Sequence, residues 1–299
     1  MRGEKSTRYR GRFAPSPTGP LHFGSLVAAV ASWLDARAAG GEWLVRIEDV
    51  DETRTVPGAD REILAQLAAF GLTHDGEVVR QSRRKALYDD ALARLATRGL
   101  VYRCRCSRRE IADSAIAGPD GPVYPGTCRT LGLDAATPGA DRIRVGEAIA
   151  FTDRVQGRIV QDVAREIGDF VLKRRDGLHA YQLAVVVDDS LQGVTDVVRG
   201  ADLLASTPRQ VLLQRLLGYP EPRYLHVPIA TDAHGEKLSK QHLAAPIEAG
   251  RASDALDAAL EFLGQEKVEA GAPAAILATA ASRWDAARIP RTMQRPATA

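Results

Sequence analysis

Residues 8–100 alternate between short strand-like segments and amphipathic helix-like segments, and this alternation limits the possible folds more than any other feature. Residues 8–14 predict a strand, residues 21–39 predict a helix, and residues 43–47 predict a second, buried strand. A further helix is expected after Pro57, and Ser82 is expected to cap another one. Strand–helix–strand order with short connections predicts an α/β layer structure around a parallel sheet.

This alternation stops near residue 101. Residues 101–150 show weak periodicity and many glycine, proline and cysteine residues, so we expect them to form an inserted subdomain. Regular structure then resumes with strands expected at residues 169–174, 183–187 and 195–199, followed by a helix at residues 207–217. After that helix the chain becomes alanine-rich and is helical in places, and its polar end, residues 290–299, is expected to be mobile.

Charge and hydropathy exclude several classes of protein. Lysine and arginine number 40 against 38 acidic residues, and the resulting net charge of +2 excludes a strongly basic, histone-like binder. No apolar run approaches the roughly 20 residues of a membrane span, and the basic start of the chain has no apolar block of a signal peptide behind it. We therefore expect a soluble, cytoplasmic protein without a membrane partner.

Two loops contain residues suited to binding a phosphate chain. The first, residues 17–25, joins a predicted strand to a predicted helix; its glycines allow a phosphate to come close, and His22 can donate to a phosphoryl oxygen. The second, residues 235–241, carries Lys237 and Lys240 in a Lys-Leu-Ser-Lys run that can neutralise a leaving pyrophosphate. Each loop alone is as compatible with an ordinary turn or a solvated charged loop.

The three cysteines, Cys104, Cys106 and Cys128, all lie within the expected insertion. Their odd number argues against a disulfide framework, and three thiolates can supply most of the tetrahedral ligand set of a structural zinc ion. The spacing alone leaves buried structural cysteines as an equally good interpretation. On spacing alone, Tyr124 is an ordinary core or surface aromatic residue.

Several ordered segments, taken together, resemble the class I aminoacyl-tRNA synthetases. The His-x-Gly of the first loop and the late Lys-Leu-Ser-Lys run resemble the paired signatures of that class. Residues 12–19 and 46–51 resemble its glutamyl branch, as do residues 185–189 followed by residues 193–202. One departure is Ser25, where a second histidine often stands, although the glutamyl branch commonly varies there.

The resemblance implies a Rossmann-type parallel sheet that is split by the insertion, and it suggests a division of the chain into four parts. The parts are residues 8–100, the first half of the catalytic domain; residues 101–150, an inserted acceptor-like subdomain with a zinc site; residues 151–240, the second half of the catalytic domain with the Lys-Leu-Ser-Lys loop; and residues 241–299, a short helical region with a mobile tail. The last part is too short to be the large anticodon-binding region of glutamyl- and glutaminyl-tRNA synthetases, so we expect none.

The chain is therefore similar to truncated paralogues of glutamyl-tRNA synthetase. These ligases activate glutamate with ATP without needing tRNA, and they then transfer it to the queuosine base in the anticodon of tRNA(Asp). The resemblance implies that the partners are glutamate, ATP accompanied by Mg²⁺, and queuosine-containing tRNA(Asp). We expect a monomer.

Glutamate carries two carboxylates and an ammonium group, so its site requires cations and an anion. Arg12, Arg199 and Glu48 follow or end predicted strands, where parallel sheets place their ligands, and an arginine can contact a carboxylate through two nitrogens. The glutamate-binding residues implied by the resemblance are Arg12, Phe13, Ala14, Pro15, Ser16, Glu48, Tyr181 and Arg199. For Arg46, Asp49 and Asp51 we prefer a role in structural pairing.

The resemblance also assigns the ATP and zinc sites. ATP would contact His22, Gly24, Lys237 and Lys240, with His22 and Lys240 as the catalytic residues. The zinc ligands would be Cys104, Cys106, Tyr124 and Cys128, and Asp113, Asp120 or water are alternatives to Tyr124.

Three other functions are compatible with part of this pattern. A truncated glutamyl-tRNA synthetase would charge the 3′ end of tRNA(Glu), and a nucleotidyltransferase would share the first and last loops. Residues 46–51 and 185–202 argue against the nucleotidyltransferase. A non-catalytic RNA-binding paralogue would keep the fold and the zinc site, but the presence of His22, Lys237 and Lys240 disfavours it.

Overall fold

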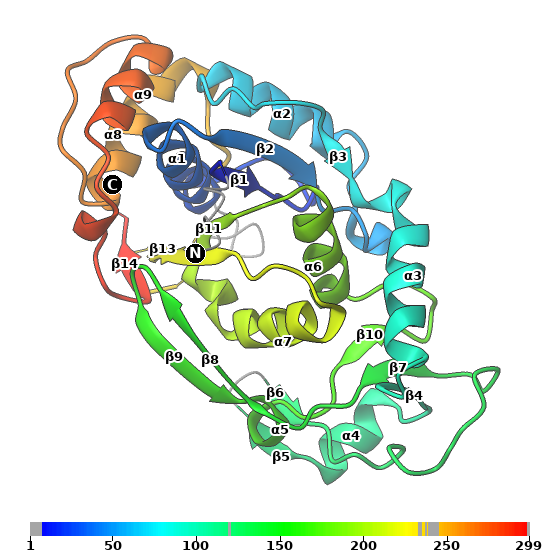
Figure 1. Ribbon diagram of the computed structural model, residues 1–299. Helices are drawn as coiled ribbons and strands as arrows, with labels where there is room; N and C mark the ends of the chain where they lie inside the picture. Colours follow the sequence, from blue (N-terminus) through cyan, green and yellow to red (C-terminus); the bar gives the residue numbers. More distant parts are fainter. Residues whose placement is uncertain (1–7, 119–120, 233–234, 237, 239–244, 298–299) are drawn as a thin grey trace, which may run out of the picture.

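The computed structural model describes residues 8–118, 121–232, 235–236, 238 and 245–297. Its centre is a set of parallel strands (Figure 1). Strand β2 pairs in parallel with β1 on one side and with β3 on the other, and β11 pairs in parallel with β12. The backbone N–H of Thr195 donates to the Arg10 carbonyl at 2.9 Å, which places β11 beside β1. The bounds are β1 Arg10–Phe13, β2 Glu42–Ile47, β3 Val79–Arg80, β11 Asp196–Gly200 and β12 Arg223–Val227.

Helices connect these strands and bury their apolar stripes against them. One apolar core joins α1 to the C-terminal helices α8 and α9, and a second lies among α3, α6 and α7. The predicted α/β fold with a parallel sheet and a helical C-terminal region is confirmed. The bounds are α1 Phe23–Ala38, α2 Ala59–Ala69, α3 Lys85–Ala96, α6 Tyr181–Leu191, α7 Thr207–Leu217, α8 Ala252–Phe262 and α9 Pro273–Ser282. Short 3₁₀ helices lie at Glu52–Arg54, Gln81–Arg83, Ala201–Ser206, Ala249–Arg251 and Ala286–Arg288.

Helix α7 shows how local sequence sets the bounds of an element. Pro208 lies in its first turn, where the missing N–H costs no hydrogen bond. The helix ends at Leu217 and is capped by Gly218, whose φ of 69° is in the left-handed region that glycine adopts without strain.

The strand expected at residues 183–187 is wrong, because these residues belong to helix α6. The helix is buried on all sides over Leu183–Asp189. A short helix without an exposed face has no apolar–polar period of 3.6, so its sequence resembles that of a buried strand. The correction matters for function, since α6 carries Tyr181 at its first turn and Asp189 near its end.

Ser82 does not cap a helix as expected. Helix α3 begins at Lys85 with Arg84 at the cap position and no side-chain cap. The Ser82 hydroxyl instead donates to the Asp49 carboxylate at 2.7 Å, and the Ser82 backbone N–H donates to the same carboxylate at 2.8 Å. Asp49 therefore has the structural pairing role that we preferred for it.

Residues 101–173 form smaller antiparallel units. Strand β7 pairs with β4 and β10, the hairpin β5–β6 carries α4 beside it, and the hairpin β8–β9 meets β12 at one residue pair, Tyr224 and Asp153. The bounds are β4 Val101–Cys104, α4 Arg108–Ser114, β5 Ile116–Gly118, β6 Gly121–Val123, β7 Ala140–Ile143, β8 Ala148–Asp153, β9 Gly157–Asp162, α5 Val163–Glu166 and β10 Val171–Lys173. The exact four-part division of the chain stays a prediction.

The end of the chain is not a free tail over residues 290–297. Strand β14, Gln294–Pro296, pairs in parallel with β13, Ile229–Thr231. The Ala297 backbone N–H also donates to the Thr231 carbonyl at 2.8 Å. The expectation of a mobile end is therefore wrong for these residues. None of the helices in the described part of the chain combines the length and the apolar character needed to cross a membrane.

Candidate active site

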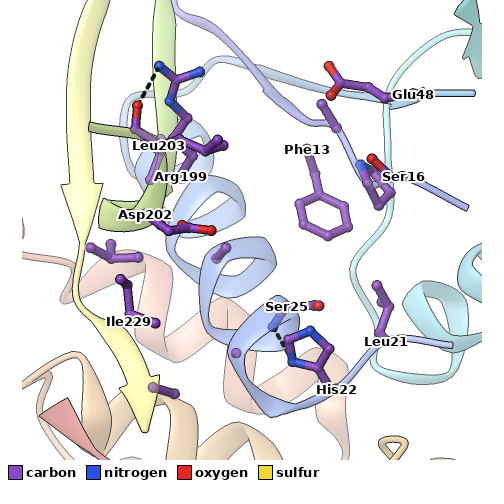
Figure 2. Close-up of a pocket in the computed structure, with 18 of the residues that line it drawn as sticks. Phe13, Ser16, Leu21, His22, Ser25, Glu48, Arg199, Asp202, Leu203 and Ile229 are labelled. Carbon is purple, nitrogen blue, oxygen red and sulfur yellow. Dashed lines mark hydrogen bonds between the residues drawn. The ribbon is translucent and has the colours of Figure 1, made fainter. Parts of the chain in front are cut away.

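A cavity of about 440 Å³ opens at the ends of β1, β2 and β11 (Figure 2). Parallel sheets commonly bind ligands at this edge, where the loops leave the strands. The cavity collects residues from separate stretches of the chain, among them the first loop, the end of β2, the start of α6, the end of β11 and residues 227–230. Among its lining residues are Arg12, Phe13, Ala14, Pro15, Ser16, His22, Gly24, Glu48, Tyr181 and Arg199. All predicted glutamate-site residues thus lie around one cavity.

Asp189 orients the Arg12 side chain through Nε and leaves the terminal nitrogens of Arg12 available to a ligand. The Arg12 side chain is 3% exposed, and Nε donates to the Asp189 carboxylate of α6 at 3.1 Å. Neither terminal nitrogen donates a hydrogen bond to the described residues. An arginine fixed in this way can present two parallel donors to a carboxylate.

Glu48 is the buried anion of the cavity. It accepts a hydrogen bond from Arg46 Nη2 at 3.2 Å, and burial raises the pKa of its carboxyl although Arg46 and Arg12 oppose that shift. Arg46 also contacts Asp189 at 2.8 Å, and Asp188 lies 3.9 Å away. Arg46 is thus the shared cation of three buried carboxylates, which is the structural pairing we preferred for it.

The Arg199 guanidinium makes more hydrogen bonds within the protein than that of Arg12. Its Nε donates to His226 Nε2 at 3.0 Å, and Nη2 donates to Thr207 Oγ1 at 2.9 Å and to Gln210 Oε1 at 2.8 Å. Nη1 makes only a long contact of 3.4 Å with the Tyr181 hydroxyl. The guanidinium therefore has one nitrogen left for a ligand, so a two-nitrogen contact to a carboxylate is not available to it as it was expected to be.

His22 and Gly24 form the start of α1 at the other end of the cavity. His22 occupies the cap position, and its Nδ1 accepts the Ser25 backbone N–H at 3.3 Å (Figure 2). A neutral ring with Nδ1 as acceptor carries its proton on Nε2. Gly24 is closely surrounded, because a Cβ there would lie 3.3 Å from the Leu238 carbonyl oxygen. A helix N-terminus with a glycine in its first turn suits a phosphate chain.

Lys237 and Lys240 lie outside the described residues. Leu238 between them is described; its backbone N–H donates to the Ala230 carbonyl at 2.8 Å, and it lines the cavity. The predicted contacts of the two lysines with ATP stay predictions.

The three cysteines lie together in the insertion. Their sulfur atoms are all within 4.8 Å of one another, and the cysteines are free thiols. The Tyr124 hydroxyl lies 3.3 Å from Cys104 Sγ and 3.9 Å from Cys106 Sγ, and it accepts the Cys128 backbone N–H at 2.9 Å. Three sulfurs and a phenol oxygen at this spacing fit a tetrahedral zinc ion.

The alternatives to Tyr124 as the fourth ligand differ in their position. Asp113 is largely exposed and lies 3.8 Å from Arg109 on the same helix. In the described part of the chain it is not among the residues that gather around the sulfurs. Asp120 lies outside the described residues. The position of the Tyr124 hydroxyl therefore favours Tyr124 over Asp113.

A second cavity, of about 800 Å³, lies between the first cavity and the thiol cluster. The two cavities share Ser16, Glu48, Arg54 and Tyr181 in their walls, and the second one extends to Cys106. Its other walls include Arg108, Arg174, Arg175 and His179. A ligand in the second cavity can therefore reach a group bound in the first.

Several residues that matter to the site were not found from the sequence. Asp189 orients Arg12, while Asp153 and His226 hold Arg199 through a chain of hydrogen bonds. Asp202 also lines the first cavity. Asp188 and Asp189 could have indicated this network from the sequence, since two carboxylates beside an apolar run must be paired when the run is buried.

Comparison with known proteins agrees with this geometry. Residues 8–265 match the family model of the catalytic domain of class I tRNA synthetases of the E and Q types. The glutamate-tRNA synthetase of Elizabethkingia anophelis has the same fold, with a TM-score of 0.82 at 23% identity over 98% of this chain and 68% of that one. The fold and the site thus define a class I aminoacyl-tRNA synthetase catalytic domain, which is a ligase.

Curated relatives narrow the class. A glutamyl-Q tRNA(Asp) synthetase of Dechloromonas aromatica is 59% identical over 95% of this chain and 96% of its own length. One of Burkholderia mallei is 58% identical over 94% of this chain and 97% of its own length. The chain belongs to the glutamyl-Q tRNA(Asp) synthetase family.

Proposed function

We propose that this chain activates glutamate with ATP and then transfers the glutamate to the queuosine base in the anticodon of tRNA(Asp). The observation that carries the activation step is the charge pattern of the first cavity, in which Arg12, Arg199 and Glu48 surround one space. Arg54 and Asp202 also line the cavity, and within this set the two cations Arg12 and Arg199 and the anion Glu48 complement an amino acid that has two carboxylates and one ammonium group. The names of the curated relatives support the acceptor.

Each charged group has a distinct part in binding glutamate. Arg12 contacts one carboxylate through its two terminal nitrogens, because only its Nε is engaged by Asp189. Arg199 contacts the other carboxylate through Nη1 alone, with the Tyr181 hydroxyl beside it. Glu48 receives the ammonium group. Buried charge-assisted contacts of this kind are stronger than neutral hydrogen bonds.

Adenylate formation takes place between the glutamate and the start of α1. An α-carboxylate oxygen attacks the α-phosphorus of ATP, the bond to the bridging oxygen breaks, and pyrophosphate leaves with its electron pair. His22 donates from Nε2 to a phosphoryl oxygen, and Gly24 lets the phosphate chain approach the helix N-terminus. Lys240, with help from Lys237, neutralises the leaving pyrophosphate. Mg²⁺ accompanies ATP and is held mainly by the phosphates.

The second cavity receives the acceptor nucleoside. A hydroxyl of the queuosine cyclopentenediol attacks the activated carbonyl carbon, and AMP leaves. This step requires a space that adjoins the adenylate, and the second cavity meets the first at Ser16, Glu48, Arg54 and Tyr181. Arg108 and Arg175 in its wall suit the backbone phosphates that flank the base.

A zinc ion at Cys104, Cys106, Tyr124 and Cys128 has a structural part. Four protein ligands close a tetrahedral site and leave no open position for a substrate. Cys106 also lines the second cavity, so the ion stabilises one wall of the space that receives the acceptor.

The activation step is tested by ATP–pyrophosphate exchange with purified protein. Exchange should depend on glutamate and proceed without tRNA, and glutamine and aspartate should support far less. Lys240→Ala should lower the exchange rate roughly 10²–10³-fold, as expected for the loss of one transition-state contact. A zinc-loaded, folded protein without glutamate-dependent exchange would overturn the proposed activity.

The acceptor is tested with radiolabelled glutamate and three RNAs. These are tRNA(Asp) with queuosine, tRNA(Asp) without queuosine, and tRNA(Glu). We expect label only in the first, and ribonuclease digestion should place it on the anticodon fragment. Label on the 3′-terminal adenosine would instead identify a truncated glutamyl-tRNA synthetase. Exchange with no label in any RNA would refute the transfer step alone.

A further inference from the structure

His226 lies behind the glutamate cavity and contacts its arginine. It belongs to β12 and is paired in register with Arg199 of the neighbouring strand β11. The side chain is fully buried, and its Nε2 accepts from Arg199 Nε at 3.0 Å. Paired positions on neighbouring parallel strands place their side chains on the same face of the sheet. The sheet register therefore accounts for the contact.

Asp153, at the end of β8, fixes the other side of the imidazole. Its Oδ2 lies 2.6 Å from His226 Nδ1. Its Oδ1 accepts three backbone N–H groups, those of Val155 at 3.0 Å, Gln156 at 2.8 Å and His226 at 3.2 Å. The carboxylate is thus fully oriented, and only Oδ2 is directed at the ring.

These contacts determine which ring nitrogen carries the proton. Burial lowers the pKa of His226 to about 4, so the ring is neutral near pH 7. An ionised carboxylate only accepts hydrogen bonds, so the proton is on Nδ1 and faces Asp153. Nε2 is then left as the acceptor that Arg199 Nε–H requires.

We propose that Asp153 and His226 are positioning residues for the substrate glutamate: Asp153 keeps the proton on Nδ1, and the unprotonated Nε2 holds Arg199 with only Nη1 directed at the substrate. This inference rests on the proposed function, because it takes Arg199 as a glutamate ligand. Neither Asp153 nor His226 lines the cavity, so both act through Arg199. The other hydrogen bonds of Arg199 do not fix Nε, because they run from Nη2 to Thr207, Gln210 and the Leu203 carbonyl and from Nη1 to Tyr181. The Thr207 hydroxyl also lies 3.2 Å from His226 Nε2.

Asp153→Asn tests the inference with a minimal change of shape. The three backbone N–H groups keep the amide oxygen at the position of Oδ1, so the amide NH₂ faces His226. That NH₂ donates to Nδ1, the ring proton moves to Nε2, and two donors then oppose each other between His226 and Arg199. Losing a charge-assisted hydrogen bond should raise KM for glutamate roughly 10- to 100-fold in the exchange assay. KM for ATP should stay unchanged.

A second variant, His226→Gln, shows whether Asp153 acts on Arg199 through His226 or whether Asp153→Asn disturbs the structure in general. In His226→Gln the side-chain amide oxygen can accept from Arg199 whatever residue 153 is. Adding Asp153→Asn to His226→Gln should therefore change KM for glutamate little, whereas His226→Leu should raise it as Asp153→Asn does. Asp169→Asn is the matched control, because Asp169 is also buried and accepts a backbone N–H, from Val145 at 2.8 Å, but lies outside the cavity. It should leave both KM values unchanged.

A spectroscopic readout does not depend on activity. Nitrogen-15 NMR of labelled histidine should show His226 with its proton on Nδ1 in the parent protein and on Nε2 in Asp153→Asn, with His226→Gln assigning the signal. The inference would be overturned if Asp153→Asn raised KM for glutamate and KM for ATP equally. It would also be overturned if adding Asp153→Asn to His226→Gln raised KM for glutamate as much as Asp153→Asn does in the parent protein. A parent ring protonated on Nε2 would overturn it as well. If the parent protein shows no glutamate-dependent exchange, the proposed function fails, while the NMR result still decides the tautomer.

Discussion

The glutamate cavity and the thiol cluster differ in how their polar groups are balanced. In the cavity, Arg12 and Arg46 share the Asp189 carboxylate, so positive and negative charges come from the chain itself. The thiol cluster instead brings together three sulfurs and the Tyr124 oxygen, which are all electron-pair donors toward a metal. The cavity should therefore be formed by the polypeptide alone, whereas the cluster should depend on a bound cation.

Removal of zinc is the most direct way to break this comparison, and we expect it to have the largest effect. Structural zinc contributes about 10–16 kcal/mol of apparent binding free energy in small zinc-binding peptides. Stripping the metal should therefore unfold the insertion and abolish transfer to tRNA, because Cys106 lines the second cavity. Glutamate-dependent exchange, measured after Mg²⁺ has been restored, should persist.

The measurement combines zinc analysis with the two activities. Cys104→Ser should reproduce the effect of the chelator without any chelator present. A parent protein purified without zinc would contradict the ligand assignment. An equal loss of exchange and transfer would show that the two regions are not independent.

Arg46→Met tests the other half of the comparison, and its effect should be the next largest. Arg46 is fully buried and contacts Asp189 at 2.8 Å and Glu48 at 3.2 Å. Removing it leaves Glu48 buried without its ion-pair partner and leaves Asp189 with Arg12 alone; breaking a buried ion pair typically costs about 3–5 kcal/mol of unfolding free energy. Urea unfolding of the zinc-loaded protein measures the loss.

The matched control for Arg46→Met is Arg80→Met. Arg80 also forms an ion pair, with Asp60 at 2.9 Å, but both side chains are partly exposed. Pairs of that kind contribute about 0–1 kcal/mol. Equal losses in the two variants would mean that the buried network has no special part in stabilising the cavity.

The same contrast shows what the sequence could predict. Periodicity placed Arg12, Glu48 and Arg199 at the ends of predicted strands, where parallel sheets bind ligands, but their assignment to the glutamate site depended on the resemblance. The cysteines were found because they are rare and clustered in the chain. Tyr181 and Tyr124 depended on resemblance, since an aromatic residue is equally common in a core.

The remaining parts of the site depend on contacts between distant residues. Arg46 reaches Asp189 from a separate strand, and Asp153 reaches Arg199 only through His226. Such pairs are set by sheet order and register, which local patterns do not specify. Helix α6 was missed for a related reason, because its burial on all sides removes the helical period.

The pH dependence of kcat/KM for glutamate tests whether the charge of Glu48 is needed in the cavity. Burial raises the pKa of Glu48, so this carboxyl gains its proton at a higher pH than an exposed one does. Only the ionised form attracts the ammonium group. We therefore expect kcat/KM for glutamate to fall as the pH is lowered through this raised pKa, by about tenfold for each further pH unit.

The control for this profile is Glu48→Gln measured over the same pH range. It should have a lower kcat/KM for glutamate at neutral pH and lack the acid limb of the parent protein. A parent profile that starts to fall only in the ordinary range of an exposed carboxyl, or a limb that persists in Glu48→Gln, would contradict the role of Glu48.

The smallest effect should come from the second cavity, where RNA contacts rather than buried pairs are expected. Arg108 is exposed and lines that cavity, so Arg108→Ala should weaken tRNA binding by removing one phosphate contact. The slope of log K against log salt concentration should flatten by about 0.7–0.9. Arg251→Ala is the matched control, because Arg251 is also exposed but borders α8 and lines neither cavity. An unchanged slope in Arg108→Ala, or the same flattening in both variants, would mean that the RNA is gripped elsewhere. A flatter salt slope in Arg108→Ala with unaltered glutamate-dependent exchange would show that acceptor binding and glutamate activation depend on separate residues.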